Sequence, residues 1–116
     1  GHLFGRFFNI KMGGLYVTLE EIRTTIDTID GEMRVLFERR MDCIQAVAEY
    51  KYNNDDEIFD HNREECVLEK NLNQLKNQKY AKAYELFLHE IMDTSKVYQT
   101  QWINDQKKKT KVNDHE

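Results

Sequence analysis

The chain has 116 residues, the length of one domain, and 33% of them are charged, 40% are hydrophobic and none is proline, which is typical of a helical protein. A formal net charge of −4 argues against a nucleic-acid binder, whose contact surface would be basic. No uninterrupted apolar run is long enough for a signal sequence or a membrane span.

The two ends of the chain differ from its middle. Residues 1–14 contain no acidic residue and end in Gly13-Gly14, so we interpret them as an expression remnant or a flexible arm. Residues 105–116 include the basic run Lys107-Lys108-Lys109-Thr110-Lys111, which we interpret as a solvated tail. The folded domain is therefore expected over residues 15–104.

A very long first helix is predicted to begin after Thr18, which forms a capping box with Glu21. Apolar residues then recur every three or four positions up to Ala48, and the helix is expected to end near Lys51 or Tyr52, before Asn53-Asn54-Asp55-Asp56. About 35 residues at ~1.5 Å each make a helix of roughly 52 Å, whereas a compact domain of this size has a radius of gyration of only ~13 Å. The part of the apolar stripe that extends beyond the globule needs a partner, and a homodimer with paired long helices supplies one.

Two further helices complete an all-α chain. The second is predicted from near Asp60, its N-cap, and carries Val67, Leu68, Leu72 and Leu75. Asn77-Gln78 is a weak break, and the third helix is predicted from about Tyr80 to Trp102.

Polar residues interrupt the apolar pattern at helical spacings. Arg40 and Lys51 are 11 residues apart, which on a helix is three turns plus about 20°, so that both project from one face about 16 Å apart. Ser95 and Gln99, at i and i+4, place neutral hydrogen-bonding groups on one face of the third helix. Two cations directed at one place favour a small polyanionic ligand.

Each of these residues also has a purely structural interpretation. Arg40, Lys51 and Gln99 would then lie on solvated helix faces, and Ser95 would bond to a backbone carbonyl. Asp60 would be only a helix cap, and Arg63 and Glu64 only a surface ion pair worth ~0–1 kcal/mol. We favour a ligand-binding site over these structural interpretations because all of these polar residues occur together in one chain.

Other chemistries lack their characteristic patterns. His61 and His89 have glutamates four residues before them, whereas a helical di-iron site needs Glu-x-x-His. There is no glycine-rich phosphate loop and no recognisable nucleophile with its base. Cys43 and Cys66 have no CxxC spacing, so a disulfide scaffold is not indicated and a reduced cytoplasmic setting is expected.

The segments LEEIRTTIDTID, FERRMDCIQAVAEYK, IFDHNREE and IMDTSKVYQTQ, between Leu19 and Gln101, resemble the all-α chorismate mutases, especially the short monofunctional type. The resemblance implies three helices per chain, an interlocked homodimer with two active sites, and the rearrangement of chorismate to prephenate on the way to phenylalanine and tyrosine. The implied reaction needs no cofactor and no metal, and the charge and the apolar runs already argue against nucleic acid and a membrane as partners.

The resemblance also assigns roles to individual residues. Arg23 is similar to the arginine lent to the partner's site, and Arg40 to the in-chain arginine that binds a carboxylate. Lys51 and Gln99 correspond to the donors to the ether oxygen, and Glu64 to the group that faces the substrate hydroxyl. Asp60, Arg63 and Ser95 correspond to further substrate-binding residues.

Two alternatives stay open beside this assignment. Arg39 is adjacent to Arg40, and only the spacing to Arg23 and Lys51 favours Arg40. The chain also resembles isochorismate pyruvate lyase around Arg39-Arg40-Met41-Asp42, but that enzyme lacks the polar residues that correspond to Glu64 and Ser95. A non-catalytic helical dimerisation module would explain the long helix but not the polar residues.

Overall fold

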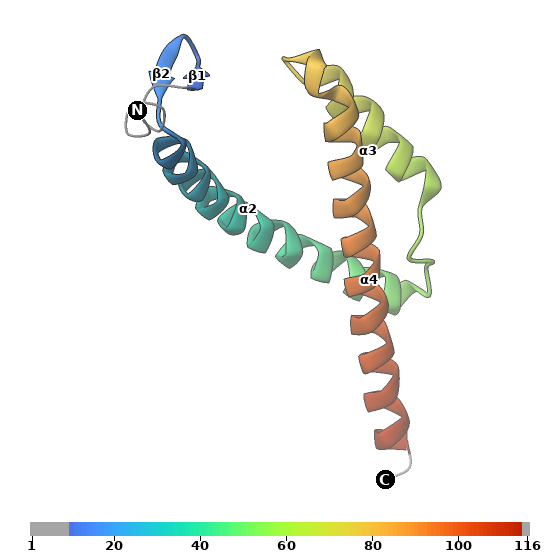
Figure 1. Ribbon diagram of the computed structural model, residues 1–116. Coiled ribbons are helices and arrows are strands. Elements are labelled where there is room, and N and C mark those ends of the chain that lie inside the picture. Colours follow the sequence, from blue (N-terminus) through green and yellow to red (C-terminus); the bar gives the residue numbers. More distant parts are fainter. Residues whose placement is uncertain (1–9, 115–116) are drawn as a thin grey trace. The chain divides into compact units, whose positions relative to one another are not determined.

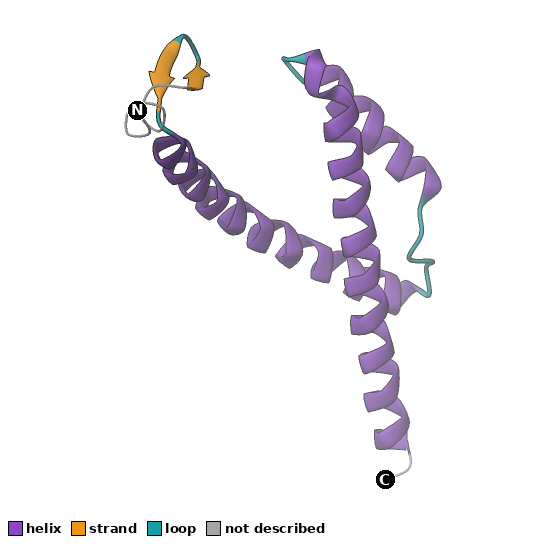
Figure 2. Ribbon diagram, in the orientation of Figure 1, coloured by secondary structure: helices purple, strands orange, loops and turns teal. Residues whose placement is uncertain are grey.

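The computed structural model describes residues 10–114. A short hairpin, β1 (Ile10–Met12) and β2 (Leu15–Val17), precedes the helices α2 (Leu19–Asn54), α3 (His61–Gln74) and α4 (Ala81–Asp114), with the 3₁₀ turn η1 (Gln78–Tyr80) before α4 (Figures 1 and 2). The prediction of three helices with a very long first one is confirmed for this part of the chain. Residues 1–9 of the predicted arm and residues 115–116 of the predicted tail lie outside the described range.

The chain divides into two compact units, Gly1–Arg40 and Met41–Glu116. The hairpin and the first part of α2 belong to the first unit. The last part of α2 belongs to the second unit, together with α3, η1 and α4.

Residues 10–14 form β1 and the turn of the hairpin, although their composition predicts a remnant or an arm outside the fold. Met12 pairs with Leu15 and Ile10 with Val17, which leaves Gly13 and Gly14 as a two-residue loop. Both glycines have positive φ, 58° and 86°. A two-residue hairpin turn of this kind matches the twist of the strands and favours glycine, which adopts positive φ without steric cost.

Local signals fix both ends of α2. The Thr18 hydroxyl accepts a hydrogen bond of 3.0 Å from the Glu21 amide, so the predicted N-terminus is confirmed. At the other end Asp55 adopts the left-handed conformation with φ of 54°. The Asp56 amide donates to the Lys51 carbonyl at 2.9 Å, and the Asp55 amide to the Tyr52 carbonyl, as in a Schellman motif. The polar run at residues 53–56 therefore ends the helix, as its composition predicts.

Between α3 and α4, side chains bond to backbone groups that have no partner within a helix. Gln78 Nε2 donates to the carbonyls of Leu72 and Leu75 at 3.1 and 2.7 Å, which satisfies acceptors left over at the end of α3. Asn77 caps η1 by accepting a bond from the Lys79 amide. Because Ala81 has helical dihedrals, η1 continues directly into α4.

The third helix is longer than predicted, since α4 continues through the expected tail to Asp114. The basic run carries neither glycine nor proline, and lysines in the last turns of a helix interact favourably with its dipole. The segment is helical, but most of its side chains are exposed, as a charged composition predicts.

The core of the second unit follows one face of α4. Figure 1 shows α3 running alongside the first half of α4, and the two helices are in contact. The end of α2 contacts α4 through an edge-to-face pair of Tyr52 with Trp102 and a 2.6 Å hydrogen bond from Tyr98 to Gln45. Among the residues of this unit whose burial is described, those buried are Ala48 on α2 and Leu88, Met92, Ser95, Gln99 and Ile103 on α4.

Apolar side chains on the first part of α2 are exposed in the single chain. They include Ile26, Ile29, Met33, Leu36 and Phe37. No helix within residues 10–114 combines the length and the apolar character that crossing a membrane would require.

Candidate active site

The eight predicted site residues are divided between the two units. Arg23 and Arg40 lie on the part of α2 that belongs to the first unit, where Arg23 is exposed and Arg40 half-buried. The remaining six belong to the second unit, on the last part of α2, on α3 with the residue that precedes it, and on α4: Lys51, Asp60, Arg63, Glu64, Ser95 and Gln99.

Ser95 and Gln99 occupy the buried face of α4, at positions where apolar residues would otherwise stand. Their exposed fractions are 4% and 5%. The interpretation of Gln99 as exposed surface is therefore wrong. Ser95 donates to the Ile91 carbonyl at 2.8 Å, so the backbone hydrogen bond suggested by the structural interpretation is present.

The Gln99 carbonyl oxygen, Oε1, is buried and has no hydrogen-bond partner among the described residues. An unsatisfied buried polar atom costs about 1–3 kcal/mol, which proteins rarely accept without a reason. The two ends of an amide are nearly the same size, so rotating the group would put the Nε2 donor where Oε1 lies. Gln99 is thus a buried amide that can still hydrogen-bond to a ligand.

Lys51 lies in the last turn of α2 and turns towards the loop that follows. Its half-buried ammonium group donates a 2.6 Å hydrogen bond to the Ile58 carbonyl. This bond joins the end of the helix to the loop that leads to Asp60. An ammonium group has three donors, so two remain for other acceptors.

The start of α3 combines a cap with two charged residues. Asp60 accepts a 3.0 Å hydrogen bond from the Arg63 amide, which confirms its predicted role as N-cap. The Arg63 side chain is exposed. Glu64, in the first turn, is half-buried and forms its ion pair with Lys96 of α4 at 3.1 Å.

Sequence reasoning missed Lys96, which lies between Ser95 and Gln99 in the sequence. Its ammonium group contacts Glu64 and also Asp93, at 3.3 Å. The i, i+3 spacing to Asp93 was a local signal for an ion pair. The contact with Glu64 joins residues 32 positions apart and had no such signal.

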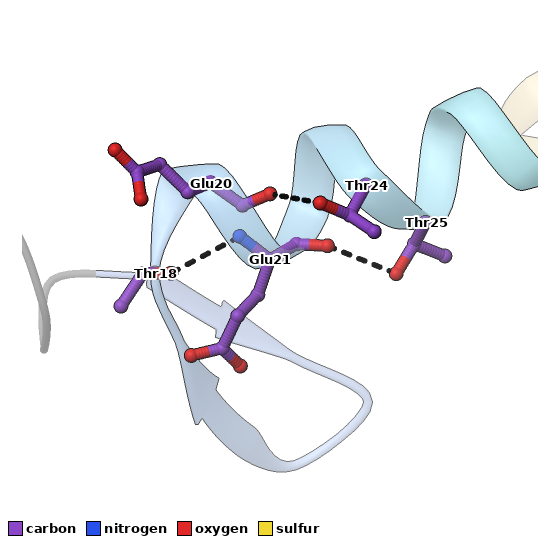
Figure 3. Close-up of a pocket in the computed structure, with 5 residues that line it drawn as sticks. All are labelled: Thr18, Glu20, Glu21, Thr24 and Thr25. Carbon is purple, nitrogen blue, oxygen red and sulfur yellow. Dashed lines mark hydrogen bonds between the residues drawn. The ribbon is translucent and has the colours of Figure 1, made fainter.

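A shallow hollow in the first unit contains none of the predicted site residues. It is lined by Thr18, Glu20, Glu21, Thr24 and Thr25 at the N-terminus of α2 (Figure 3). The hydroxyls of Thr24 and Thr25 donate to the carbonyls of Glu20 and Glu21 at 3.0 Å, so they are used within the helix.

A comparison with protein families shows that these residues belong to one known domain. The family model for chorismate mutase type II matches residues 22–100, which is more than half of the chain. The chain belongs to the chorismate mutase type II family. The resemblance read from the sequence is thereby confirmed, and a family of this kind suggests an isomerase. Neither the curated proteins nor the solved structures give a significant match.

All eight predicted site residues fall within the range matched by the chorismate mutase model, as does Lys96. The hairpin precedes this range, and the last 14 residues of α4, 101–114, follow it.

Proposed function

We propose that the protein is a chorismate mutase, which rearranges chorismate to prephenate in the biosynthesis of phenylalanine and tyrosine. The observation that carries this proposal is Gln99, a buried amide in the core of a chorismate mutase domain whose carbonyl has no partner among the described residues. A core position favours an apolar residue, so a buried amide there requires an explanation, and binding of a substrate provides one.

The proposed reaction needs binding and charge stabilisation more than acid–base chemistry. Within one molecule of chorismate an ether C–O bond breaks while a C–C bond forms, so no atom leaves and no proton is transferred. The enzyme has to hold a compact conformer of a dicarboxylate. It also has to stabilise the negative charge that grows on the ether oxygen, for which preorganised donors are each worth roughly 10²–10³ in rate.

In this proposal each site residue has one role. Arg40, and Arg23 from a second chain, bind the two carboxylates, because a guanidinium group matches a carboxylate with two parallel hydrogen bonds. Lys51 and Gln99 donate to the ether oxygen, and Glu64 accepts from the substrate hydroxyl. The further contacts to the substrate are assigned to Asp60, Arg63 and Ser95.

We propose that the active form is an interlocked homodimer. The exposed apolar side chains of the first part of α2 support it, because a contiguous exposed apolar face usually marks an interface. A second copy of the same helix can cover this face by two-fold symmetry.

The test is to follow the conversion of chorismate to prephenate by the purified protein. The same preparation, given isochorismate, should release no pyruvate, which separates the mutase from the lyase. Lys51→Ala should abolish most of the activity. Lys82→Ala is the matched control, because Lys82 is an exposed lysine in the first turn of α4, whereas Ser95 and Gln99 lie much further along that helix. A folded, dimeric protein that leaves chorismate unchanged would refute the proposed function and favour a non-catalytic dimerisation module.

A further inference from the structure

Lys96 is held by groups from three segments of the second unit. Its ammonium nitrogen lies 3.1 Å from Glu64 Oε2 and 3.3 Å from Glu64 Oε1 on α3. It lies 3.3 Å from Asp93 Oδ1 on α4 and 4.9 Å from the centroid of the Phe59 ring in the loop before α3. These contacts restrict a side chain that would otherwise have four rotatable bonds.

The surroundings of Lys96 favour its charged form. The hydrogen bond to Glu64 has the largest effect and raises the pKa of Lys96; partial burial lowers it, and the hydrogen bond to Asp93 raises it again. The net direction is upward from the ordinary value of 10.5, so the side chain is a cation at neutral pH. The face of the Phe59 ring adds a favourable cation–π contact.

The same contacts restrict Glu64. One ammonium group lies within hydrogen-bonding distance of both of its carboxylate oxygens, at 3.1 and 3.3 Å. A glutamate has three rotatable bonds, and holding it in one conformation in advance removes an entropic cost from the binding of a ligand. Because each carboxylate oxygen has two lone pairs, Glu64 can keep the bond to Lys96 and still accept another hydrogen bond.

We propose that Lys96 is a positioning residue, which holds the Glu64 carboxylate where it accepts a hydrogen bond from the hydroxyl group of the substrate. This inference rests on the proposed function, in which Glu64 faces that hydroxyl. Lys96 acts through Glu64 and does not itself contact the reacting atoms. It therefore differs from Lys51, whose role is to donate to the ether oxygen.

The first test compares kcat/KM for Lys96 variants with chorismate. Lys96→Met keeps the length and the apolar part of the side chain but removes the charge, and it should lower kcat/KM by about 10-fold, a size typical of coupled neighbours. Lys96→Arg keeps the cation and should restore most of the loss. Lys96→Gln, which keeps a donor without the charge, should lie between them and serves as a second variant if Lys96→Met folds poorly.

Two controls separate positioning from general damage. Asp93→Asn removes the other ionic partner of Lys96, but the Asp93 side chain is 62% exposed. An exposed ion pair within one helix is worth little, so kcat/KM should change less than about twofold. Lys82→Met makes the same chemical change as Lys96→Met at an exposed position of α4 and should also have little effect.

The decisive test uses a chorismate analogue that lacks the ring hydroxyl. If Lys96 acts by orienting Glu64 towards that hydroxyl, Lys96→Met and the wild type should have equal kcat/KM with the analogue. In the same way, Lys96→Met should add little to the loss already caused by Glu64→Gln. A merely structural role would lower the rate by the same factor with both substrates and in both backgrounds.

The outcomes distinguish this inference from the proposed function. A wild-type protein that does not convert chorismate overturns both. An active wild type overturns only the inference if Lys96→Met keeps its kcat/KM with chorismate, or if its loss is equally large with the analogue. A 10-fold loss that disappears with the analogue is the expected result.

Discussion

Lys51 combines a structural bond with a proposed catalytic role. Its ammonium group donates to the Ile58 carbonyl, and it is also the proposed donor to the ether oxygen of the substrate. We expect Lys51→Ala to lower kcat by at least ~10²-fold, since a donor that acts mainly in the transition state affects kcat more than KM. The helix content, measured by circular dichroism, should stay unchanged. A variant with nearly normal kcat would leave Lys51 with only its bond to the loop and remove it from the site.

Gln99 has to donate a hydrogen bond if it acts on the ether oxygen. We therefore expect Gln99→Glu to have low activity at neutral pH, because an ionised carboxylate only accepts. The activity should recover as the pH falls and the carboxyl group gains a proton. Burial at this position disfavours the charged form, so the recovery should begin above the ordinary glutamate pKa of about 4.3.

The measurement for Gln99 is a profile of kcat/KM from pH 4 to pH 8 for both proteins. Gln99→Met, which has no donor at any pH, is the control and should stay inactive throughout. If Gln99→Glu follows the wild-type profile, Gln99 does not donate to the substrate.

At the scale of the element, α3 depends on a cap that is also a proposed site residue. Asp60→Ala removes the acceptor for the Arg63 amide and should lower the free energy of unfolding by about 0.5–2 kcal/mol. Asp60→Asn keeps an acceptor at the cap but removes the charge, so it should be nearly as stable as the wild type.

Comparing the two Asp60 variants separates the cap from the site. The stability is read from urea unfolding and the activity from kcat/KM with chorismate. If Asp60 binds substrate through its charge, Asp60→Asn should lose activity while it keeps its stability. If Asp60→Asn is fully active, the cap is its whole function and Asp60 leaves the list of substrate-binding residues.

At the scale of the whole molecule, the proposed dimer predicts that each site takes Arg23 from the partner chain. Arg23 and Arg40 are 17 residues apart on α2, so they are separated by ~25 Å along the helix and by about 100° around it. Two side chains of one helix placed in this way cannot hold one small ligand. An antiparallel partner helix can bring its own Arg23 next to the local Arg40.

The test mixes two inactive variants, Arg23→Ala and Lys51→Ala, after they are unfolded and refolded together. In a mixed dimer one site carries both changes and the other carries neither. Random pairing makes about half of the dimers mixed, so about a quarter of all sites should have wild-type residues. Activity should reach roughly a quarter of the wild-type value. If the mixture stays inactive while subunit exchange is demonstrated, the shared site is wrong.

The number of helices, the start of α2 and α3, and the family could all be predicted without a structure, whereas the end of α4 could not. The capping bonds, from the Glu21 amide to the Thr18 hydroxyl and from the Arg63 amide to the Asp60 carboxylate, each join residues three positions apart. Such signals are complete within one turn of helix, which is why they can be read without a structure. The family was recognised differently, from the resemblance of four segments between Leu19 and Gln101 to chorismate mutases, and the match over residues 22–100 confirms that resemblance.

Which polar residues are buried, and what they contact, depends on how the helices pack and could not be read from the sequence. A sequence reading allows Gln99 to be an exposed residue, and it is the packing of the second unit that buries it. The pair of Lys96 with Glu64 joins two helices across 32 positions, and no local rule predicts it. Burial and long-range pairs depend on how helices pack against one another, whereas helix ends depend on neighbours along the chain.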